Sequence, residues 1–150
     1  MIEDHFGLYR CLRDARVKYL IIGGVASIAY GVPRTTNDLD IFLKPDLDNC
    51  HNFLSALKEV PLGTAYLTTA EDLSRHDLTV IEDVLRLDVL TKVKGIAFDE
   101  CWRRRAVKKI AGIAVNLISL DDLIRSKSVV GRKIDRDDIR LLRKIKRQTY

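Results

Sequence analysis

Two stretches, Tyr19-Leu-Ile-Ile-Gly-Gly-Val-Ala-Ser27 and Arg34-Thr-Thr-Asn-Asp-Leu-Asp-Ile-Phe-Leu43, decide how this chain is expected to fold. In the first, an apolar strand runs into a pair of glycines and a short helix follows. In the second, Asp38 and Asp40 occupy alternate positions of the next strand, so both point to one face, about 6–7 Å apart along the backbone. The pattern predicts an anion-binding turn beside a pair of carboxylates that bind a divalent cation.

The two aspartates interrupt a strand whose other face is aliphatic, so their placement costs free energy unless they are solvated or bound to a cation. A third carboxylate, Asp88, stands in the middle of another apolar strand, residues 85–90. Three carboxylates on neighbouring strands suit two Mg²⁺ or Mn²⁺ ions, as in phosphoryl transfer. Simpler roles stay open: a solvated strand edge or a turn cap for the pair, and a salt bridge to Arg86 or Lys92 for Asp88.

The glycine pair, Gly23 and Gly24, follows a strand and opens a helix. Backbone N–H groups at such a turn are able to face an anion at the positive end of the helix dipole. A tight turn without a ligand is the alternative.

Hydrophobic periodicity and turn residues predict the remaining elements. The expected strands are residues 17–22, 38–43, 79–81 and 85–90, with two short strands around Gly112 within 106–118. The expected helices are residues 3–16, 25–30, 47–60, 119–130 and 135–147, with a helical turn at 96–104. This mixture is typical of an α/β or α+β fold around one small sheet. We expect one domain, residues 1–150, with a core of about 17–118 and C-terminal helices of about 119–148.

Charge is distributed unevenly along the chain: residues 1–100 carry a net charge of −5 and residues 101–150 a net charge of +10. A basic excess of this size attracts polyanions such as a nucleoside triphosphate or RNA. For residues 140–147, a solvated helix face is the alternative.

Other features of the chain predict a cytoplasmic protein. Its apolar runs fall short of the ~20 residues that span a bilayer, and the start, Met-Ile-Glu-Asp-His, lacks the basic and apolar regions of a signal peptide. The chain has an odd number of cysteines and they are widely spaced, which is typical of cysteines that stay reduced and do not form a disulfide or a zinc site. They are Cys11, Cys50 and Cys101.

These motifs resemble the nucleotidyltransferase superfamily of the DNA polymerase beta type. Its members share a strand, a Gly-Gly or Gly-Ser turn, a short helix, a hydrophobic-Asp-hydrophobic-Asp strand and a later acidic residue. Residues 34–40 are especially similar to bacterial and archaeal uncharacterised or toxin-like members, including the abortive-infection type. The resemblance covers residues 17–90 and is looser beyond them. It implies a small mixed sheet flanked by helices, two magnesium ions, and transfer of a nucleoside monophosphate from a triphosphate such as ATP, with pyrophosphate leaving.

The resemblance also implies roles for the carboxylates and the glycines. Asp38 and Asp40 would bind both metal ions, and Asp88 would complete the catalytic ion and help to deprotonate the acceptor hydroxyl. The two glycines would approach the β- and γ-phosphates. Many members have a serine where this chain has Gly24, and we expect Ser27 to replace its contact with the triphosphate.

The helix around Lys127 is similar to that of the toxin-like members, in which a helical lysine precedes a cluster of Arg, Lys and Asp. Lys127 lies at i+7 from Leu120 on an apolar stripe, so its ammonium either snorkels to solvent or reaches over the cleft toward the triphosphate. Arg34 is a second phosphate-binding candidate. Asp135 and Asp138 are expected to stabilise the first turn of the last helix.

The sequence therefore favours a nucleotidyltransferase with an unidentified acceptor, which is RNA, a protein or a small molecule. One alternative is a catalytically inactive nucleotide-binding regulatory or toxin-antitoxin module that acts with a partner protein. The other is a basic RNA-binding protein. For an RNA acceptor, the expected docking patch comprises Arg103, Arg104, Arg105, Lys108 and Lys109.

Overall fold

The computed structural model describes residues 7–60, 67–82 and 85–149. Within these ranges the strands are β1 (Tyr19–Ile22), β2 (Asp38–Leu43), β3 (Leu78–Glu82), β4 (Arg86–Leu90), β5 (Ala106–Ile110) and β6 (Ile113–Leu117). The helices are α1 (Leu8–Asp14), α2 (Gly23–Tyr30), α3 (Leu47–Leu57), α4 (Ala70–Arg75), α5 (Phe98–Arg103), α6 (Leu120–Val130) and α7 (Lys133–Thr149). The predicted α/β class is confirmed.

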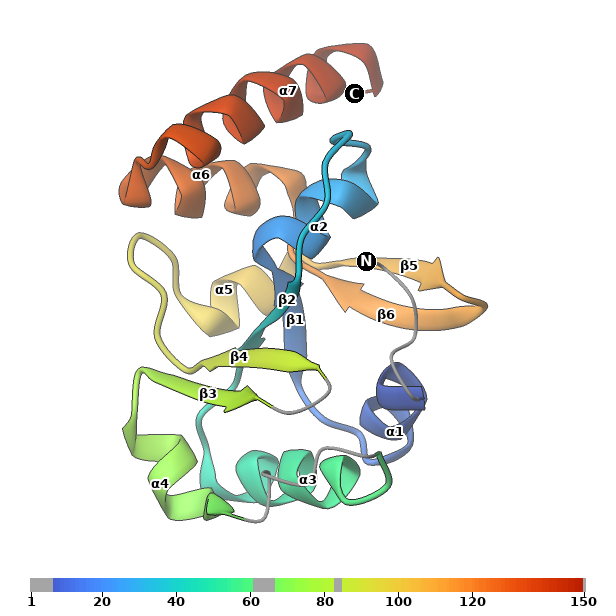
Figure 1. The fold of residues 1–150 in the computed structure, drawn as a ribbon, viewed down its shortest axis with the longest axis vertical. Helices are drawn as coiled ribbons and strands as arrows, with labels where there is room; N and C mark the ends of the chain where they lie inside the picture. The colour runs from blue at the N-terminus through green and yellow to red at the C-terminus, as the bar shows by residue number, and fades with distance from the viewer. Residues whose placement is uncertain (1–6, 61–66, 83–84, 150) are drawn as a thin grey trace.

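The six strands form one mixed sheet in the order β3-β4-β2-β1-β6-β5. The central strand β2 pairs antiparallel with β1 and parallel with β4, although about forty residues of sequence separate β2 from β4. Figure 1 shows the result: α6 and α7 lie side by side at one end of the molecule, next to α2, and α3 and α4 lie at the opposite end. The start of α2 and the acidic strand β2 therefore lie between these two ends.

Side-chain alternation along β2 separates its two faces. Leu39 and Ile41 are fully buried in the core, whereas Asp38 and Asp40 point to the other face and are partly exposed. On that other face, Phe42 is covered by Phe98 of α5, with the ring centroids 5.2 Å apart. The carboxylates therefore occupy the end of β2 that α5 leaves open.

Several elements differ in length from the sequence-based prediction. Helix α2 begins at Gly23 and not at residue 25, so the glycines form its first turn. Helix α4 was not predicted; it is one short helix whose N-cap, Thr69, accepts a hydrogen bond from the backbone N–H of Asp72. Residues 3–6 of the first expected helix lie outside the described ranges, and α3 ends at Leu57, before residue 60.

Two predictions of local structure are confirmed. Strand β2 has the expected bounds, and Ser119 caps α6 by accepting a hydrogen bond from the backbone N–H of Asp122. The three cysteines are free. In the part of the chain that the structure describes, none of the helices has the length and apolar character of a membrane span.

Candidate functional site

The predicted carboxylates lie on adjacent strands and in register. In the parallel pair of β2 and β4, Asp40 is opposite Asp88 and Asp38 is opposite Arg86. Because residues directly opposite in a sheet share a face, the side chains of Asp38, Asp40 and Asp88 project from one face of the sheet. The strand pairing therefore brings together residues that are fifty positions apart in the sequence.

Arg86 lies between two of these carboxylates. Its Nε atom donates a hydrogen bond to Oδ1 of Asp88 over 3.0 Å and lies 3.8 Å from Oδ1 of Asp38. The simpler role for Asp88, a salt bridge to Arg86, is therefore present. Among the described residues, no three acidic, histidine or cysteine side chains are grouped closely enough to hold a metal ion as they stand. Metal binding at all three aspartates therefore requires the carboxylates to move closer together and Arg86 to release Asp88.

Asp40 has a different environment. Within the described ranges, no side chain or backbone donor lies within hydrogen-bond or ion-pair distance of its carboxylate. Burial, followed by the negative charges of Asp88 and Asp38, raises the pKa of Asp40 from its ordinary 3.8 to about 6, against the opposing charges of Lys127 and Arg132. Asp40 is thus a partly buried carboxylate that lies near two others and has no direct counter-ion, and oxygen ligands of this kind suit a hard divalent cation.

Gly23 allows the Asp40 carboxylate to approach the backbone. Its φ of +68° lies in the left-handed region, and a Cβ at this position would overlap with Oδ2 of Asp40 and lie 2.9 Å from its Cγ. Helix α2, which starts here, has no side-chain N-cap hydrogen bond, so its first N–H groups are not used by a capping side chain. The turn thus combines a helix start that no side chain caps with a partly buried carboxylate.

We expect Gly23→Ala to destabilise the protein by about 3 kcal/mol, because it adds left-handed strain of about 1–2 kcal/mol to a steric overlap. Gly112→Ala is the matched control: Gly112 has a φ of +81°, and nothing lies within 4 Å of its added Cβ. This control isolates the backbone strain and should cost about 1 kcal/mol. Urea unfolding measures both variants, and equal losses would show that the Asp40 contact is not tight.

The second position of the turn is Gly24, and the side chains of Thr36 and Arg34 lie beside it. A Cβ at Gly24 would lie 3.1 Å from Oγ1 of Thr36 and 3.3 Å from Nη2 of Arg34. The guanidinium of Arg34 is therefore beside the glycine turn, where a phosphate-binding cation is useful. Thr36 was not predicted as a site residue; its hydroxyl lies at the turn where many superfamily members have a serine.

Ser27 is placed differently from the expectation. It is fully buried, and its hydroxyl donates a hydrogen bond over 3.3 Å to the carbonyl oxygen of Gly23, one turn earlier in α2. In this arrangement Ser27 supports the glycine turn from within the helix. A direct contact with a triphosphate would require this hydrogen bond to break.

Lys127 does not snorkel to solvent. It is 5% exposed, and its Nζ atom lies 3.0 Å from Oδ2 of Asp138 and 3.6 Å from Oδ1 of Asp135. The snorkelling alternative is wrong because α7 packs on α6 and brings two carboxylates to the apolar stripe on which the lysine lies. Lys127 also lies near enough to Asp40 to lower the pKa of that carboxyl.

Asp135 and Asp138 do more than stabilise the first turn of α7. Asp138 binds Arg34 as well as Lys127, with 2.6 Å between Arg34 Nη1 and Asp138 Oδ2. Asp135 accepts hydrogen bonds from the backbone and the side chain of Arg132. Although burial acts in the opposite direction, these contacts and the charge of Lys127 hold the pKa of Asp135 below its ordinary value. One carboxylate, Asp138, thus positions both predicted phosphate-binding cations.

The predicted docking patch is largely engaged in intramolecular contacts. Arg104 forms two 3.0 Å hydrogen bonds with Asp122, which is fully buried. Arg105 stacks over the Trp102 ring at 3.9 Å, and Lys108 lies over the Tyr30 ring at 4.5 Å. These side chains stabilise the junction of α5, β5 and α6.

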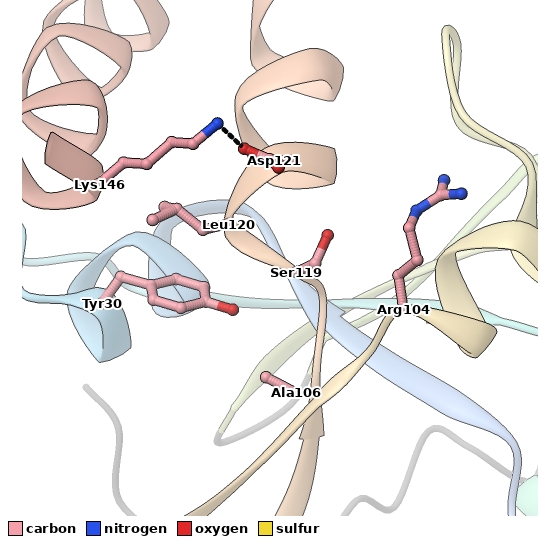
Figure 2. Close-up of a pocket in the computed structure, with 7 residues that line it drawn as sticks. All are labelled: Tyr30, Arg104, Ala106, Ser119, Leu120, Asp121 and Lys146. Carbon is pink, nitrogen blue, oxygen red and sulfur yellow. Dashed lines mark ion pairs between the residues drawn. The ribbon is translucent and has the colours of Figure 1, made fainter. Parts of the chain in front are cut away.

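A pocket of about 330 Å³ lies at the same junction (Figure 2). Figure 2 shows Lys146 of α7 paired with Asp121 of α6 on one side of this pocket and Arg104 on the other. Ser119 and Leu120, which also line it, begin α6, whereas Lys127 lies near the opposite end of that helix. The pocket therefore shares no residue with the carboxylate site.

Comparison with known proteins places these features in context. A family model described as nucleotidyl transferase of unknown function (DUF2204) matches residues 2–150. In structure, the chain is similar to an antigenic nucleotidyltransferase-like protein from Paracoccidioides brasiliensis, with a TM-score of 0.57 and 18% sequence identity. That likeness covers 93% of this chain and 72% of the other, and at this identity it shows the fold alone. None of the curated protein sequences matches this chain.

Proposed function

Since this chain belongs to the family of nucleotidyl transferases of unknown function (DUF2204), we propose that it transfers a nucleoside monophosphate from a nucleoside triphosphate to an acceptor hydroxyl. The observation that carries the proposal is the in-register pair of Asp40 and Asp88 beside the glycine turn. Neither a purely structural salt bridge nor a tight turn requires a half-buried carboxylate that has no direct counter-ion. A cation held between the strands accounts for that placement.

Two Mg²⁺ or Mn²⁺ ions would be held by these carboxylates once they move closer together than they are in the structure, with Asp38 and Asp40 holding both ions and Asp88 completing the catalytic one. When bound, such ions would offset the charge of the triphosphate and lower the pKa of the acceptor hydroxyl. Arg86 must first release Asp88, to which it is bound in the structure. The exposed position of the Arg86 side chain makes this rotation sterically possible.

The remaining site residues would bind the donor. The N–H groups of Gly23 and Gly24 would face the β- and γ-phosphates at the start of α2. Lys127 and Arg34 would place two positive charges beside these phosphates. Because Asp138 already holds both side chains, they would not have to be ordered when the triphosphate reacts.

In the transfer step, the acceptor oxygen forms a bond to the α-phosphorus and the bond from that phosphorus to the bridging oxygen of pyrophosphate breaks. Pyrophosphate carries away the bonding electron pair, and the acceptor proton passes to a carboxylate oxygen of Asp88. This displacement needs the attacking and leaving oxygens to lie in line with the α-phosphorus. The glycine turn, which would bind the leaving phosphates, and Asp88, which would accept the proton, lie on opposite sides of Asp40, so they would support this geometry.

A second candidate function is a nucleotide-binding module that does not catalyse transfer. The Arg86–Asp88 ion pair is the observation that favours it, because a permanent pair would keep the third carboxylate from a metal ion. The two candidate functions differ in whether Arg86 releases Asp88 when a metal ion is present.

Manganese binding and pyrophosphate release together test the proposal. We expect the wild-type protein to bind Mn²⁺ by titration calorimetry and to release pyrophosphate from at least one triphosphate in the presence of cellular RNA or protein. We expect Arg86→Gln to bind Mn²⁺ several-fold more tightly, because the competing guanidinium is removed.

Arg75→Gln is the matched control for this experiment, since Arg75 pairs with Asp72 at 3.1 Å on an exposed helix away from the site. It should leave Mn²⁺ affinity unchanged. Metal-dependent triphosphate binding without turnover for any acceptor would favour the non-catalytic module. If the protein shows neither metal-dependent triphosphate binding nor turnover, the proposed function is wrong.

A further inference from the structure

Helix α7 carries a row of arginines that the proposed site does not use. Arg136, Arg140, Arg143 and Arg147 follow one another at intervals of four, three and four residues, which places them on one face of the helix. We call these four residues the arginine stripe. All four are exposed to solvent.

The stripe is poorly neutralised by the protein itself. In the described part of the chain, no carboxylate lies within ion-pair distance of Arg143 or Arg147, and Arg140 is paired only weakly, at 4.0 Å, with Asp137. Arg136 donates to a carbonyl oxygen, that of Gly131, and so keeps its charge uncompensated. A helix face that is simply exposed to solvent usually carries a mixture of acidic and basic residues, whereas this face carries arginines alone.

The stripe borders a groove and does not simply project into solvent. A cavity of about 460 Å³ is lined by the four arginines together with Ser128 of α6 and Ile139 of α7. Figure 1 shows α7 running back over α6 from the turn that joins them, and Ser128, near the end of α6, lines the groove beside α7. The buried face of α7, including Leu142, holds the helix in place, so the guanidinium groups are presented from a fixed support.

The dimensions and chemistry of the stripe suit a nucleic-acid backbone. Its four arginines span about 16 Å at 1.5 Å per residue, and a nucleic-acid strand presents a phosphate about every 3.4 Å of its axis. Guanidinium groups bind phosphate oxygens through two parallel hydrogen bonds. Neither α6 nor α7 contains an aromatic residue in its described range, so base stacking is not available and the contacts would be to phosphates.

The position of the stripe connects it to the carboxylate site. Arg136 follows Asp135 directly and lies less than one turn from Asp138, which holds Lys127 and Arg34. A strand bound along the stripe would therefore have one end directed toward the site. RNA suits this position because every ribose offers a hydroxyl, the group that the proposed transfer requires of its acceptor.

We propose that the arginine stripe binds the phosphate backbone of RNA and directs RNA to the carboxylate site. The role of RNA as acceptor rests on the proposed function, whereas the binding surface itself does not. Binding is independent of base sequence, because phosphates carry no sequence information.

Fluorescence anisotropy with a labelled RNA hairpin of about 16 base pairs tests this surface in the absence of metal ions and triphosphate. The variant Arg140→Glu/Arg143→Glu/Arg147→Glu should lose about tenfold or more in affinity, and the slope of log affinity against log salt should fall by roughly 2 to 3. The control Arg10→Glu/Lys18→Glu/Lys58→Glu makes the same change in net charge at three exposed residues around α1 and α3, at the opposite end of the molecule from α7. It should retain most of the affinity.

An equal loss in both triple variants would overturn the proposal, because affinity would then follow net charge alone. Tighter binding of a poly-glutamate peptide or of anionic vesicles would overturn the choice of a nucleic acid, and transfer to DNA but not to RNA would overturn the choice of RNA. If the Glu variant unfolds by circular dichroism, the Gln versions of the same three residues should still reduce affinity several-fold. RNA binding that persists without any pyrophosphate release would contradict the proposed function and leave this surface intact.

Discussion

Asp40→Asn is expected to reduce nucleotide transfer by roughly 100-fold to 1,000-fold and, in the metal-free protein, to increase stability above about pH 6. Loss of transfer follows because the substitution removes a negative ligand from the centre of the carboxylate group. The gain in stability follows from the environment of Asp40, which disfavours its charged form. A residue that served only the fold would not show both effects.

The pH dependence of this stability effect has a definite sign. Asp40 titrates near 6 when folded and near 3.8 as a free side chain, so the folded protein binds the extra proton between these values. Its contribution to stability is fully present below about pH 4 and is lost as the pH rises through about 6. Asparagine does not ionise, so the Asp40→Asn protein should be more stable than the wild type at pH 8. Because solvent screens the partly exposed carboxylate, we expect this difference in stability to be only about 1–2 kcal/mol.

Urea unfolding in a chelator, at about pH 4 and about pH 8, measures the stability difference, and pyrophosphate release measures transfer. Asp77→Asn is the control, because Asp77 is exposed and no ion pair to it is present among the described residues. It should change neither quantity. An Asp40→Asn protein that keeps wild-type turnover would refute the metal-ligand role, and an identical stability difference at both pH values would refute the charge argument.

Lys127→Met is expected to destabilise the protein by about 3 kcal/mol, toward the lower end of the range for breaking a buried ion pair. The substitution leaves Asp135 and Asp138, which are 1% and 2% exposed, without their shared ammonium. Each keeps one arginine, Arg132 and Arg34 respectively, which limits the cost. Methionine retains the packing volume, so the loss reports the charge.

Arg125→Met is the matched control on the same helix. Arg125 also pairs with a fully buried carboxylate, Asp122, at 2.9 Å, but it is largely exposed and Arg104 holds the same carboxylate. Its removal should cost less than about 1 kcal/mol. Urea unfolding near neutral pH compares the two variants, and equal costs would contradict the buried-network interpretation.

Adding Asp138→Asn to the Lys127→Met protein provides a second check. It removes one of the two buried negative charges that shared the ammonium, so part of the lost stability should return, and the effects of the two substitutions should not be additive. Strict additivity would mean that Lys127 and Asp138 do not depend on each other.

Local physics made much of this site predictable from the sequence. A strand has a side-chain period of two, so the Asp-Leu-Asp-Ile-Phe-Leu run alone predicted that Asp38 and Asp40 share a face and that aliphatic residues occupy the other. A glycine pair at a strand end predicted a turn, and Ser119 predicted a helix cap. Each of these inferences depends only on residues within a few positions of one another.

Inferences that needed contacts between distant segments were incomplete. Helical spacing put Lys127 on an apolar stripe, but its partners come from α7, whose packing the spacing does not specify. The basic run at 103–109 resembled a docking patch, and only the fold showed Arg104 and Lys108 engaged with Asp122 and Tyr30. Helix α4 was missed because six residues give too little periodicity to detect.

By itself, the sequence of this protein predicted which side chains are candidates for the chemistry. It also determined to which face of their own strand Asp38 and Asp40 belong, because backbone geometry sets that face. Tertiary structure alone decided that β2 pairs with β4 in the register that places Asp40 opposite Asp88. It also decided which face of α7 is buried, and therefore that its arginine stripe is exposed. Strand pairing and helix packing are set by burial of the whole apolar surface, which no short stretch of sequence contains.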